Sequence, residues 1–263
     1  MSLYEKKQDE CCIIIKAQPH RSSKYFETVC CAGIGRDGVW RRQYPVPFRN
    51  LPKNQKFGRW DWIEYDWVKP SDDLRAESQK VDPDSIVVKG KMTKAEQIKL
   101  LNPLVRSSFA ESNDKGDSLT LIRPKEIKFK WSKKSQSELE SEASKHAELS
   151  RQLPMFGETV EDWDPSPYSF RLDWVDLDNT KRSHEMDDWE TLGAYFRFER
   201  DHGEENALKI LREKYEKERF NNGLVLGFST HKRRNATRGT ENQWLLVGLL
   251  ALPENNQPDM FLG

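Results

Sequence analysis

Short apolar, β-branched runs separated by turn-forming residues fill the first half of the chain. Runs of about four to eight such residues, bounded by glycine or proline, are typical of β-strands. They predict strands at residues 11–17, 28–34, 39–44, 61–68 and 85–89, and two more between residues 119 and 131. Asp37-Gly38 is a hairpin signal between the second and third of these strands. Many short strands in one stretch predict a compact, barrel-like β-domain over residues 1–131.

The composition of the sequence changes at Ser132, where serine, lysine and glutamate replace the apolar runs. Leu139, Ala143 and Ala147 recur every four residues, which gives a thin helical stripe. We therefore expect a polar, partly helical linker at residues 132–167, with a domain boundary inside it.

The C-terminal part combines strand and helix patterns. The elements expected there are a strand at residues 170–177, amphipathic helices at 187–201 and 205–220, and apolar strands at 223–230 and 243–252. The order predicts a small strand-helix-helix-strand-strand unit over residues 168–263. The chain as a whole is then α+β, with two units joined by the linker.

Composition narrows the classes of function. Lysine plus arginine and aspartate plus glutamate number 43 each, so global charge attracts neither nucleic acid nor an anionic membrane. No apolar run reaches the roughly 18–20 residues that span a bilayer. The N-terminus also lacks the apolar core of a secretory signal. We therefore expect a cytoplasmic protein without a membrane anchor, in which any basic surface is local.

The four cysteines form two adjacent pairs, Cys11-Cys12 and Cys30-Cys31. Neighbouring residues of a strand point to opposite faces, so each pair offers one sulfur to each face. The Cys-x-x-Cys spacing of a zinc knuckle is missing. The pairs predict buried, reduced cysteines and no metal site. The alternative is a two-cysteine metal or redox site across paired strands, and the sequence names no cofactor.

The 28 residues that begin at Trp40 hold eight aromatic side chains interleaved with arginine and lysine. Aromatic faces stack on bases, and guanidinium groups bind phosphates. Trp40, Arg42 and Tyr44 share one strand face, and the proline-stiffened turn after them presents Phe48 and Arg49. These five side chains form a candidate nucleic-acid surface. The alternative is a domain core with a charged rim, which better fits the later rings that are divided between two faces.

Three carboxylates and one arginine follow Pro70 at the end of a strand, in the order Asp72, Asp73, Arg75 and Glu77. Strand-end loops often carry sites, but this spacing matches no loop that binds a hard cation. The cluster favours a solvated turn with a local Asp–Arg pair over a cation site.

A second polar cluster combines His184, Asp188 and Glu190, at an expected helix start, with His231 at the end of a later strand. His184 and Asp188 share a helix face if the helix extends that far back. A His–carboxylate pair facing His231 could serve as catalytic acid and base or hold a metal. Acidic residues are equally expected at any helix N-terminus, because they stabilise the helix dipole.

Lys232, Arg233, Arg234 and Arg238 lie in one acid-free loop between two apolar strands. As the tip of a hairpin, such a loop would project basic groups toward phosphates. The alternative is plain solvation of the charges.

Two short segments resemble the bacterial sliding-clamp-binding pentapeptide, Gln-Leu-(Ser/Asp)-Leu-Phe. One contains Gln152, Leu153, Met155 and Phe156, and the other contains Gln257, Met260 and Phe261. A flexible peptide with one glutamine and two apolar anchors suits a groove on a partner. The resemblance implies the replication sliding clamp as a partner. The alternative is that these apolar residues dock on their own domain.

Residues 29–51 and 57–78 resemble an uncharacterised bacterial family met beside mobile-element and genome-defence genes, through the pattern Arg-x-Tyr-Pro-x-Pro-Phe-Arg. The run from Phe170 to Leu250 is similar to the C-terminal part of the same proteins. The resemblance implies an N-terminal barrel akin to the PUA and ASCH domains, which bind nucleic acid. Cysteines of a small metal knuckle are expected before the histidine in relatives. This chain has Asp176 and Asp178 there, so metal binding is not carried over.

The leading hypothesis is therefore binding of nucleic acid, either DNA or RNA, in bacterial DNA maintenance or genome defence. The alternatives are a metal-assisted nuclease or nucleotide hydrolase that uses the His/Asp/Glu cluster, and an adaptor recruited by the sliding clamp. The chain lacks a P-loop, a dinucleotide-binding glycine motif, a serine-hydrolase elbow and a His-Glu-x-x-His motif. These absences argue against nucleotide-driven motors, dinucleotide oxidoreductases and serine hydrolases.

Overall fold

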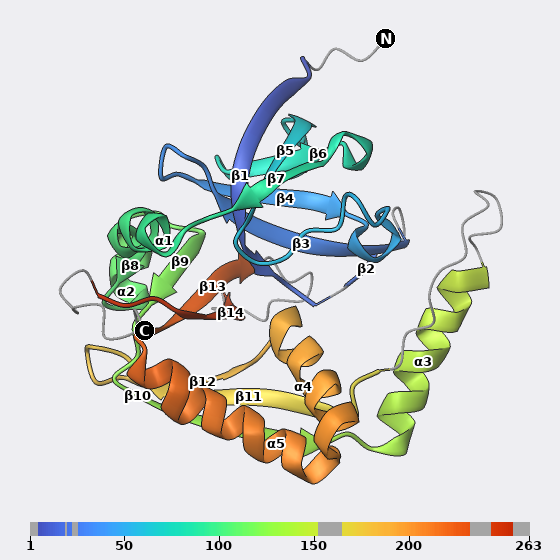
Figure 1. Ribbon diagram of the computed structural model, residues 1–263, viewed down its shortest axis with the longest axis vertical. Coiled ribbons are helices and arrows are strands. Elements are labelled where there is room, and N and C mark those ends of the chain that lie inside the picture. The colour runs from blue at the N-terminus through green and yellow to red at the C-terminus, as the bar shows by residue number, and fades with distance from the viewer. Residues whose placement is uncertain (1–4, 19, 23–25, 152–164, 232–242, 255–263) are drawn as a thin grey trace.

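Five strands close into a β-barrel, which lies at the top of the computed structural model in Figure 1. The structure describes residues 5–18, 20–22, 26–151, 165–231 and 243–254. Around the ring the strands are β1 (Lys7–Lys16), β3 (Phe26–Ile34), β4 (Trp40–Val46), β6 (Ser78–Val81) and β5 (Asp61–Val68). β5 pairs back onto β1, and only the β4–β6 pair is parallel. A mixed α/β fold with a barrel in the N-terminal region is therefore confirmed.

Because side chains alternate along each strand, apolar residues of the same strand both fill the barrel and cover its outer surface. Cys11 and Ile13 point into the barrel with Tyr65, whereas Cys12 and Ile14 belong to a second cluster outside it. The expected division of adjacent cysteines between two faces is thus confirmed at Cys11-Cys12. Burial raises the pKa of the Cys11 thiol to about 12, so this cysteine is a packing group and not a nucleophile.

Short elements decorate the barrel and lead away from it. These are β2 (His20–Ser22), η1 (Phe48–Asn50), η2 (Pro83–Ser85), β7 (Val87–Lys91), α1 (Lys94–Leu101), η3 (Asn102–Leu104) and α2 (Phe109–Asp114). α1 begins with a capping box formed by Thr93 and Glu96. The Glu96 amide donates to Thr93 Oγ1 at 3.2 Å, and the Thr93 amide donates to Glu96 Oε2 at 2.8 Å.

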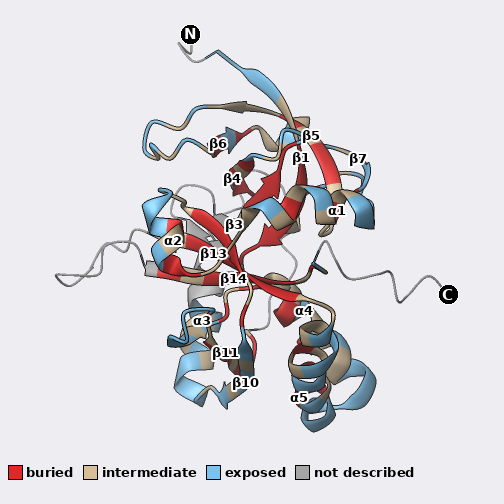
Figure 2. Cartoon of the chain, turned by 90° about the vertical axis from the view of Figure 1, so that its left-hand side faces the viewer, coloured by how far each residue is buried: buried red, intermediate tan, exposed pale blue. Residues whose placement is uncertain are grey.

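A four-stranded sheet lies in the middle of the molecule, between the barrel and the C-terminal helices (Figures 1 and 2). Its strands are β14 (Gln243–Ala251), β13 (Leu224–His231), β9 (Leu119–Ile122) and β8 (Val105–Arg106), in that order. One face of β13 and β14 carries Val225 and Val247, which pack against the outside of the barrel. The opposite face carries Leu226 and Phe228, which belong to the C-terminal core.

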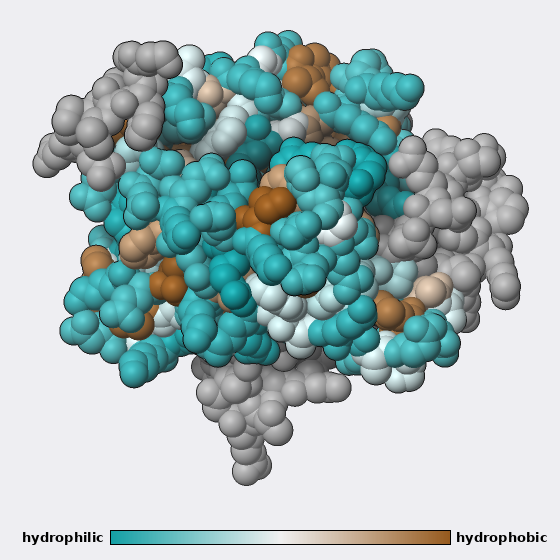
Figure 3. Space-filling model, turned by 60° about the horizontal axis from the view of Figure 1, so that its bottom comes forward, coloured by the Kyte–Doolittle hydropathy of each residue, from teal (hydrophilic) through white to brown (hydrophobic). Residues whose placement is uncertain are grey.

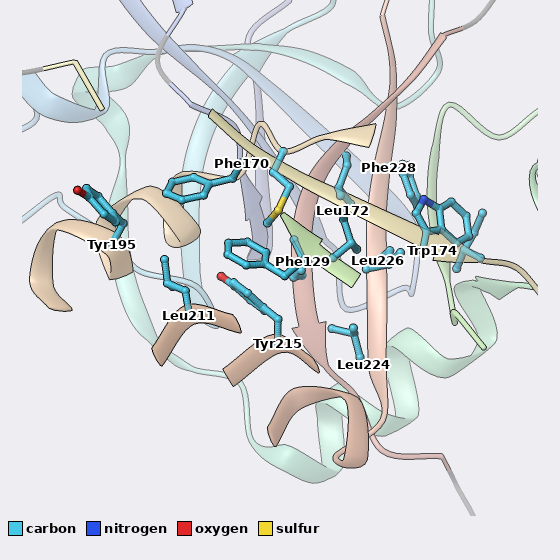
Figure 4. Packing of buried hydrophobic residues seen from close by; sticks show 14 of the residues in the cluster. Phe129, Phe170, Leu172, Trp174, Tyr195, Leu211, Tyr215, Leu224, Leu226 and Phe228 are labelled. Carbon is cyan, nitrogen blue, oxygen red and sulfur yellow. The ribbon is translucent and has the colours of Figure 1, made fainter. Parts of the chain in front are cut away.

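The third layer is a three-stranded sheet with two helices beside it. Its strands are β10 (Glu126–Lys133), β11 (Tyr168–Val175) and β12 (Lys181–Glu185), and its helices are α4 (Trp189–His202) and α5 (Glu204–Glu213), which continues as η4 (Lys214–Arg219). Figure 4 shows Phe129 next to Tyr215 in this core, with ring centroids 5.3 Å apart. α3 (Gln136–Arg151) stands away from the body in Figure 1.

The predicted C-terminal unit is not confirmed in its specific form. β12 adds a strand, and β13 pairs with β9 as well as with β14. β10 pairs with β11 along its full length. Strands that come before and after the predicted linker at residues 132–167 therefore share sheets. The sequence pattern of the linker correctly predicted a helix, α3. The pairing of distant strands could not be predicted, because it has no local sequence signal.

The surface is dominated by polar groups, in keeping with the 33% of charged residues. The face in Figure 3, which is the lower side of Figure 1, is mostly hydrophilic with small, separate apolar patches. Within the parts of the chain that the structure describes, every helix is too short or too polar to cross a membrane.

Candidate functional site

The aromatic block is mostly core. Trp40, at 9% exposure, and Trp62 pack between the barrel and the middle sheet, while Tyr65 lies inside the barrel. Trp40 is therefore placed where it cannot stack on a base, which corrects its assignment to the contact surface. The reason is that Trp40 belongs to a buried cluster that also contains Leu121 of β9 and Val225 of β13. The sequence of one strand does not indicate which part of its outer face will be covered by another sheet.

Arg42 is buried two residues further along the same face. Its Nη1 donates to Ser229 Oγ at 2.7 Å, its Nη2 donates to the Ser118 carbonyl at 3.0 Å, and Glu77 lies 3.5 Å from Nη2. Burial lowers the pKa of Arg42, and the neighbouring Arg75 lowers it further. Arg42 thus ties the barrel to the middle sheet, and its assignment as a contact residue is corrected in the same way.

The loop after Pro70 contains the expected Asp–Arg pair. Arg75 donates to Asp73 from Nε at 2.9 Å and from Nη2 at 2.6 Å, and Ser78 Oγ donates to Asp73 at 2.7 Å. Partial burial opposes ionisation of Asp73, but these hydrogen bonds outweigh it and hold its pKa well below the usual range. The local Asp–Arg pair predicted from the sequence is confirmed.

Arg75 also joins this loop to the end of β13, which is followed in the sequence by the basic segment of Lys232, Arg233, Arg234 and Arg238. Its Nη1 donates to the Thr230 carbonyl at 3.0 Å, one residue before His231. The group formed by Arg42, Asp73, Arg75, Glu77, Ser118 and Ser229 is called the arginine seam below. It brings together residues from the aromatic block, the acidic turn and the strand that leads into the basic loop. Lys232, Arg233, Arg234 and Arg238 themselves lie outside the described residues.

Two side chains near the seam reach the surface. Tyr44 follows Arg42 on the outer face of β4, is 38% exposed, and is paired in register with the exposed Lys80 on β6. Leu74 lies in the acidic turn and is 89% exposed. Leu74 was not predicted as a site residue, although it is an isolated leucine between charged residues just after a strand end.

A second set of predicted residues meets at the start of α4. The ring of Phe48 packs edge-on against Trp189, with centroids 5.4 Å apart. Lys16 Nζ lies 4.6 Å above the Phe48 ring and 3.0 Å from Glu190. Arg49 is half-buried next to Phe48 in η1. Phe48 and Glu190, from separate sequence clusters, thus face the same lysine. The group formed by Lys16, Phe48, Arg59, Asp188, Trp189 and Glu190 is called the α4 junction.

Asp188 is fully buried in the α4 junction. It is the N-cap of α4, and it accepts from Arg59 Nη2 at 3.0 Å and from Thr191 Oγ1 at 2.8 Å. Burial raises the pKa of Asp188, while Arg59 and Thr191 oppose that rise. Helix capping and an ion pair therefore explain why a carboxylate lies here. This agrees with the alternative that the acidic residues stabilise the start of a helix.

His184 lies in a different environment from the two carboxylates. α4 begins at Trp189, so His184 belongs to strand β12 and does not share a helix face with Asp188. Its Nδ1 accepts from the Trp174 indole at 3.0 Å, and the ring packs against Phe109 and Phe228. The side chain of His231 lies outside the described residues. The expected His–carboxylate pair is therefore not formed by His184.

Burial gives His184 a testable pH signature. Burial first, then Arg182 and Arg171, lower the pKa of His184 from 6.5 to about 4. Between these values the unfolded chain binds more protons than the folded chain. Stability should then fall as pH decreases from about 6.5 toward 4, by up to about 3 kcal/mol. Urea unfolding of the wild type and His184→Gln at several pH values checks this. A wild-type-minus-variant difference that does not change with pH would contradict it.

Among the described residues, no three histidine, cysteine, aspartate or glutamate side chains gather closely enough to hold a metal ion. Both clamp-like segments, with Gln152, Leu153, Met155 and Phe156 in one and Gln257, Met260 and Phe261 in the other, lie outside the described residues. Recruitment by the sliding clamp stays a prediction.

Two family models match the chain. The model described as "Domain of unknown function (DUF8758)" matches residues 7–107, and "Domain of unknown function (DUF8757)" matches residues 104–262. No curated protein and no solved structure matches it. The matches meet at β8, so the arginine seam and the α4 junction each join residues of both matched ranges. Because the second match covers more than half of the length of the chain, the chain belongs to the family of the domain of unknown function DUF8757.

Proposed function

We propose that this protein binds nucleic acid and acts in bacterial DNA maintenance or genome defence. The observation that carries the proposal is the hydrogen bond from Arg75 to the Thr230 carbonyl. It fixes Thr230 of β13 at the arginine seam, two residues before Lys232 in the sequence. The chain then continues with Lys232, Arg233, Arg234 and Arg238. Four cations in seven residues supply the local charge that a chain without net charge otherwise lacks.

The proposed contact surface differs from the one expected from the sequence alone. Trp40 and Arg42 are left out because they are buried, and Tyr44, which belongs to the expected set, is joined by the exposed Lys80 beside it. Tyr44 offers a ring for stacking on a base, and the cations offer contacts to phosphates. Phe48 and Arg49 are left out, because Phe48 is held against Trp189 in the α4 junction.

The barrel itself supports the proposal at the level of fold. We infer that it is of the PUA/ASCH kind, because a closed ring of five strands occupies the residues that carry the family resemblance. The nuclease alternative has less support, since Asp188 and Glu190 are engaged in ion pairs with Arg59 and Lys16.

Titration of labelled single- and double-stranded DNA and RNA at two salt concentrations tests the proposal. We expect at least one of these ligands to bind with an affinity that falls as salt rises. Tyr44→Ala should weaken that binding by about 1–3 kcal/mol, because a stacked base loses its platform. Tyr44→Phe keeps the ring and is the matched control. Failure of all four nucleic acids to bind in a salt-dependent way would contradict the proposal.

A further inference from the structure

A pocket of about 210 Å³ opens where three connections of the C-terminal part meet. They are the link between β9 and β10, the turn from η4 into β13, and the residues after β14. Arg123, Phe220, Leu224 and Glu254 are among the residues that line it. Pockets for drug-sized ligands measure roughly 300–1,000 Å³, so this one suits a smaller molecule. It lies apart from the arginine seam, because Leu224 and Thr230 are near opposite ends of β13.

The guanidinium of Arg123 is only partly paired within the fold. Its Nε lies 3.2 Å from Glu254 Oε1, and its Nη2 donates to Asn102 Oδ1 at 3.4 Å. Its Nη1 is buried and has no hydrogen-bond partner among the residues that the structure describes. A buried donor without a partner is costly, and more so when the group is charged. The pocket therefore favours a ligand that supplies an acceptor for Nη1.

The counter-ion of Arg123 lies largely in solvent, unlike that of a comparable arginine. The side chain of Arg59 is 10% exposed, and its partner Asp188 is fully buried. The side chain of Arg123 is 16% exposed, whereas that of Glu254 is 63% exposed. An ion pair with so exposed a carboxylate contributes little. Burial lowers the pKa of Arg123, and Glu254 offsets this only in part, so the positive charge is incompletely balanced.

Asn102 and Gly223 set the position of the guanidinium. The Asn102 amide donates from Nδ2 to the carbonyls of Ile98 and Pro253 at 3.2 and 3.0 Å, which leaves its Oδ1 for Arg123. Gly223 has a φ of 76°, and a Cβ on it would lie 3.0 Å from Arg123 Nη1. Because Gly223 lines the pocket and carries no side chain, a ligand atom can approach Nη1 at this point. The cation is thus held in place before a ligand arrives, which favours binding.

We propose that this pocket binds a small organic carboxylate, with Arg123 as its anchor. One guanidinium matches one carboxylate, which accepts hydrogen bonds from two of its nitrogen atoms. Pro124, Phe220 and Leu224 supply an apolar part of the wall, which suits a short hydrocarbon chain or a ring. Arg123 is the one cation among the described residues of the lining, and Glu254 would repel the second charge of a phosphate. A singly charged ligand therefore fits best.

Benzoate and benzamide test the site, because they share a ring and differ in the charge of the head group. Ligand-observed NMR titration of the full chain, at constant ionic strength and without nucleic acid, measures both affinities. We expect the wild type to bind benzoate about tenfold more tightly than benzamide, because charge-assisted hydrogen bonds are the stronger ones. Arg123→Gln should lose this preference.

Two further variants make the test specific. Glu254→Gln removes the carboxylate that competes with the ligand for the guanidinium, and should tighten benzoate binding by about two- to fivefold. Because the Glu254 side chain is mostly exposed, this change should leave the fold intact. Lys125→Gln is the matched control. It removes an exposed cation two residues from Arg123, paired with Asn179 Oδ1 at 2.8 Å, and should bind benzoate as the wild type does.

Equal binding of benzoate and benzamide by the wild type would overturn the proposal. An unchanged affinity of Glu254→Gln for benzoate would also overturn it, even if Arg123→Gln does not fold. A loss in Lys125→Gln as large as that in Arg123→Gln would mean that general charge, and not this pocket, attracts the ligand. Tighter binding of inorganic phosphate than of benzoate would contradict the assignment of a carboxylate. None of these results depends on nucleic-acid binding, so the two proposals are tested separately.

Discussion

Asp188→Ala should lower the free energy of unfolding by about 3–5 kcal/mol. The change leaves the guanidinium of Arg59, with only 10% of its side chain exposed, without its carboxylate partner. It also removes the N-cap of α4 and the acceptor of the Thr191 hydroxyl. Urea unfolding at pH 7, followed by far-UV circular dichroism, measures the loss.

Two variants make this stability test specific. Asp188→Asn keeps a good N-cap and an acceptor oxygen, so it should cost less than the alanine variant. Asp201→Ala removes a carboxylate from an exposed pair with Arg200 and should change stability by less than about 1 kcal/mol. If Asp188→Ala loses no more than Asp201→Ala, the α4 junction does not hold the barrel and the C-terminal part together.

Replacing Lys232, Arg233, Arg234 and Arg238 together by serine should weaken nucleic-acid binding by about 10³- to 10⁴-fold at 0.1 M salt. Each phosphate contact contributes roughly a factor of eight at this concentration. The loss should be similar for all sequences, because phosphate contacts carry no sequence information directly. Fluorescence anisotropy with matched duplexes of different sequence measures it.

The matched control replaces two lysines on the surface of the C-terminal helices. Lys209 and Lys217 are 64% and 72% exposed and lie on α5 and η4. Lys209→Ser with Lys217→Ser should leave the affinity within about twofold of the wild type. An equal loss in both proteins would mean that binding depends on total charge and not on the basic segment.

Local patterns in the sequence predicted much of the barrel. The β-branched run that contains Ile13 and Ile14 marked β1, and alternation marked β5 with Trp62 and Tyr65 on different faces. β12 escaped prediction because its sequence, Lys-Arg-Ser-His-Glu, has no apolar alternation. It is held as a strand by pairing with β11, which is a tertiary effect with no local signal.

The candidate site was predicted in pieces and not as a whole. The Asp73–Arg75 pair is local, two residues apart, and sequence spacing was enough to suggest it. Arg42 and Ser229 are 187 residues apart, and their contact depends on how the middle sheet covers β4. The same covering turned Trp40 from a candidate ligand contact into core. Packing between distant elements decides which face of a strand remains exposed to solvent. Residue type and spacing along the sequence do not indicate it.

The slope of binding affinity against salt concentration tests the central claim most directly. The claim is that Lys232, Arg233, Arg234 and Arg238, which follow Thr230 in the sequence, make the phosphate contacts. We expect the wild type to show a clear decrease of log affinity with log salt. The quadruple serine variant should lose about 3–4 units of that slope if all four cations contact duplex DNA. A wild type without salt dependence, or a variant with an unchanged slope, would contradict the account.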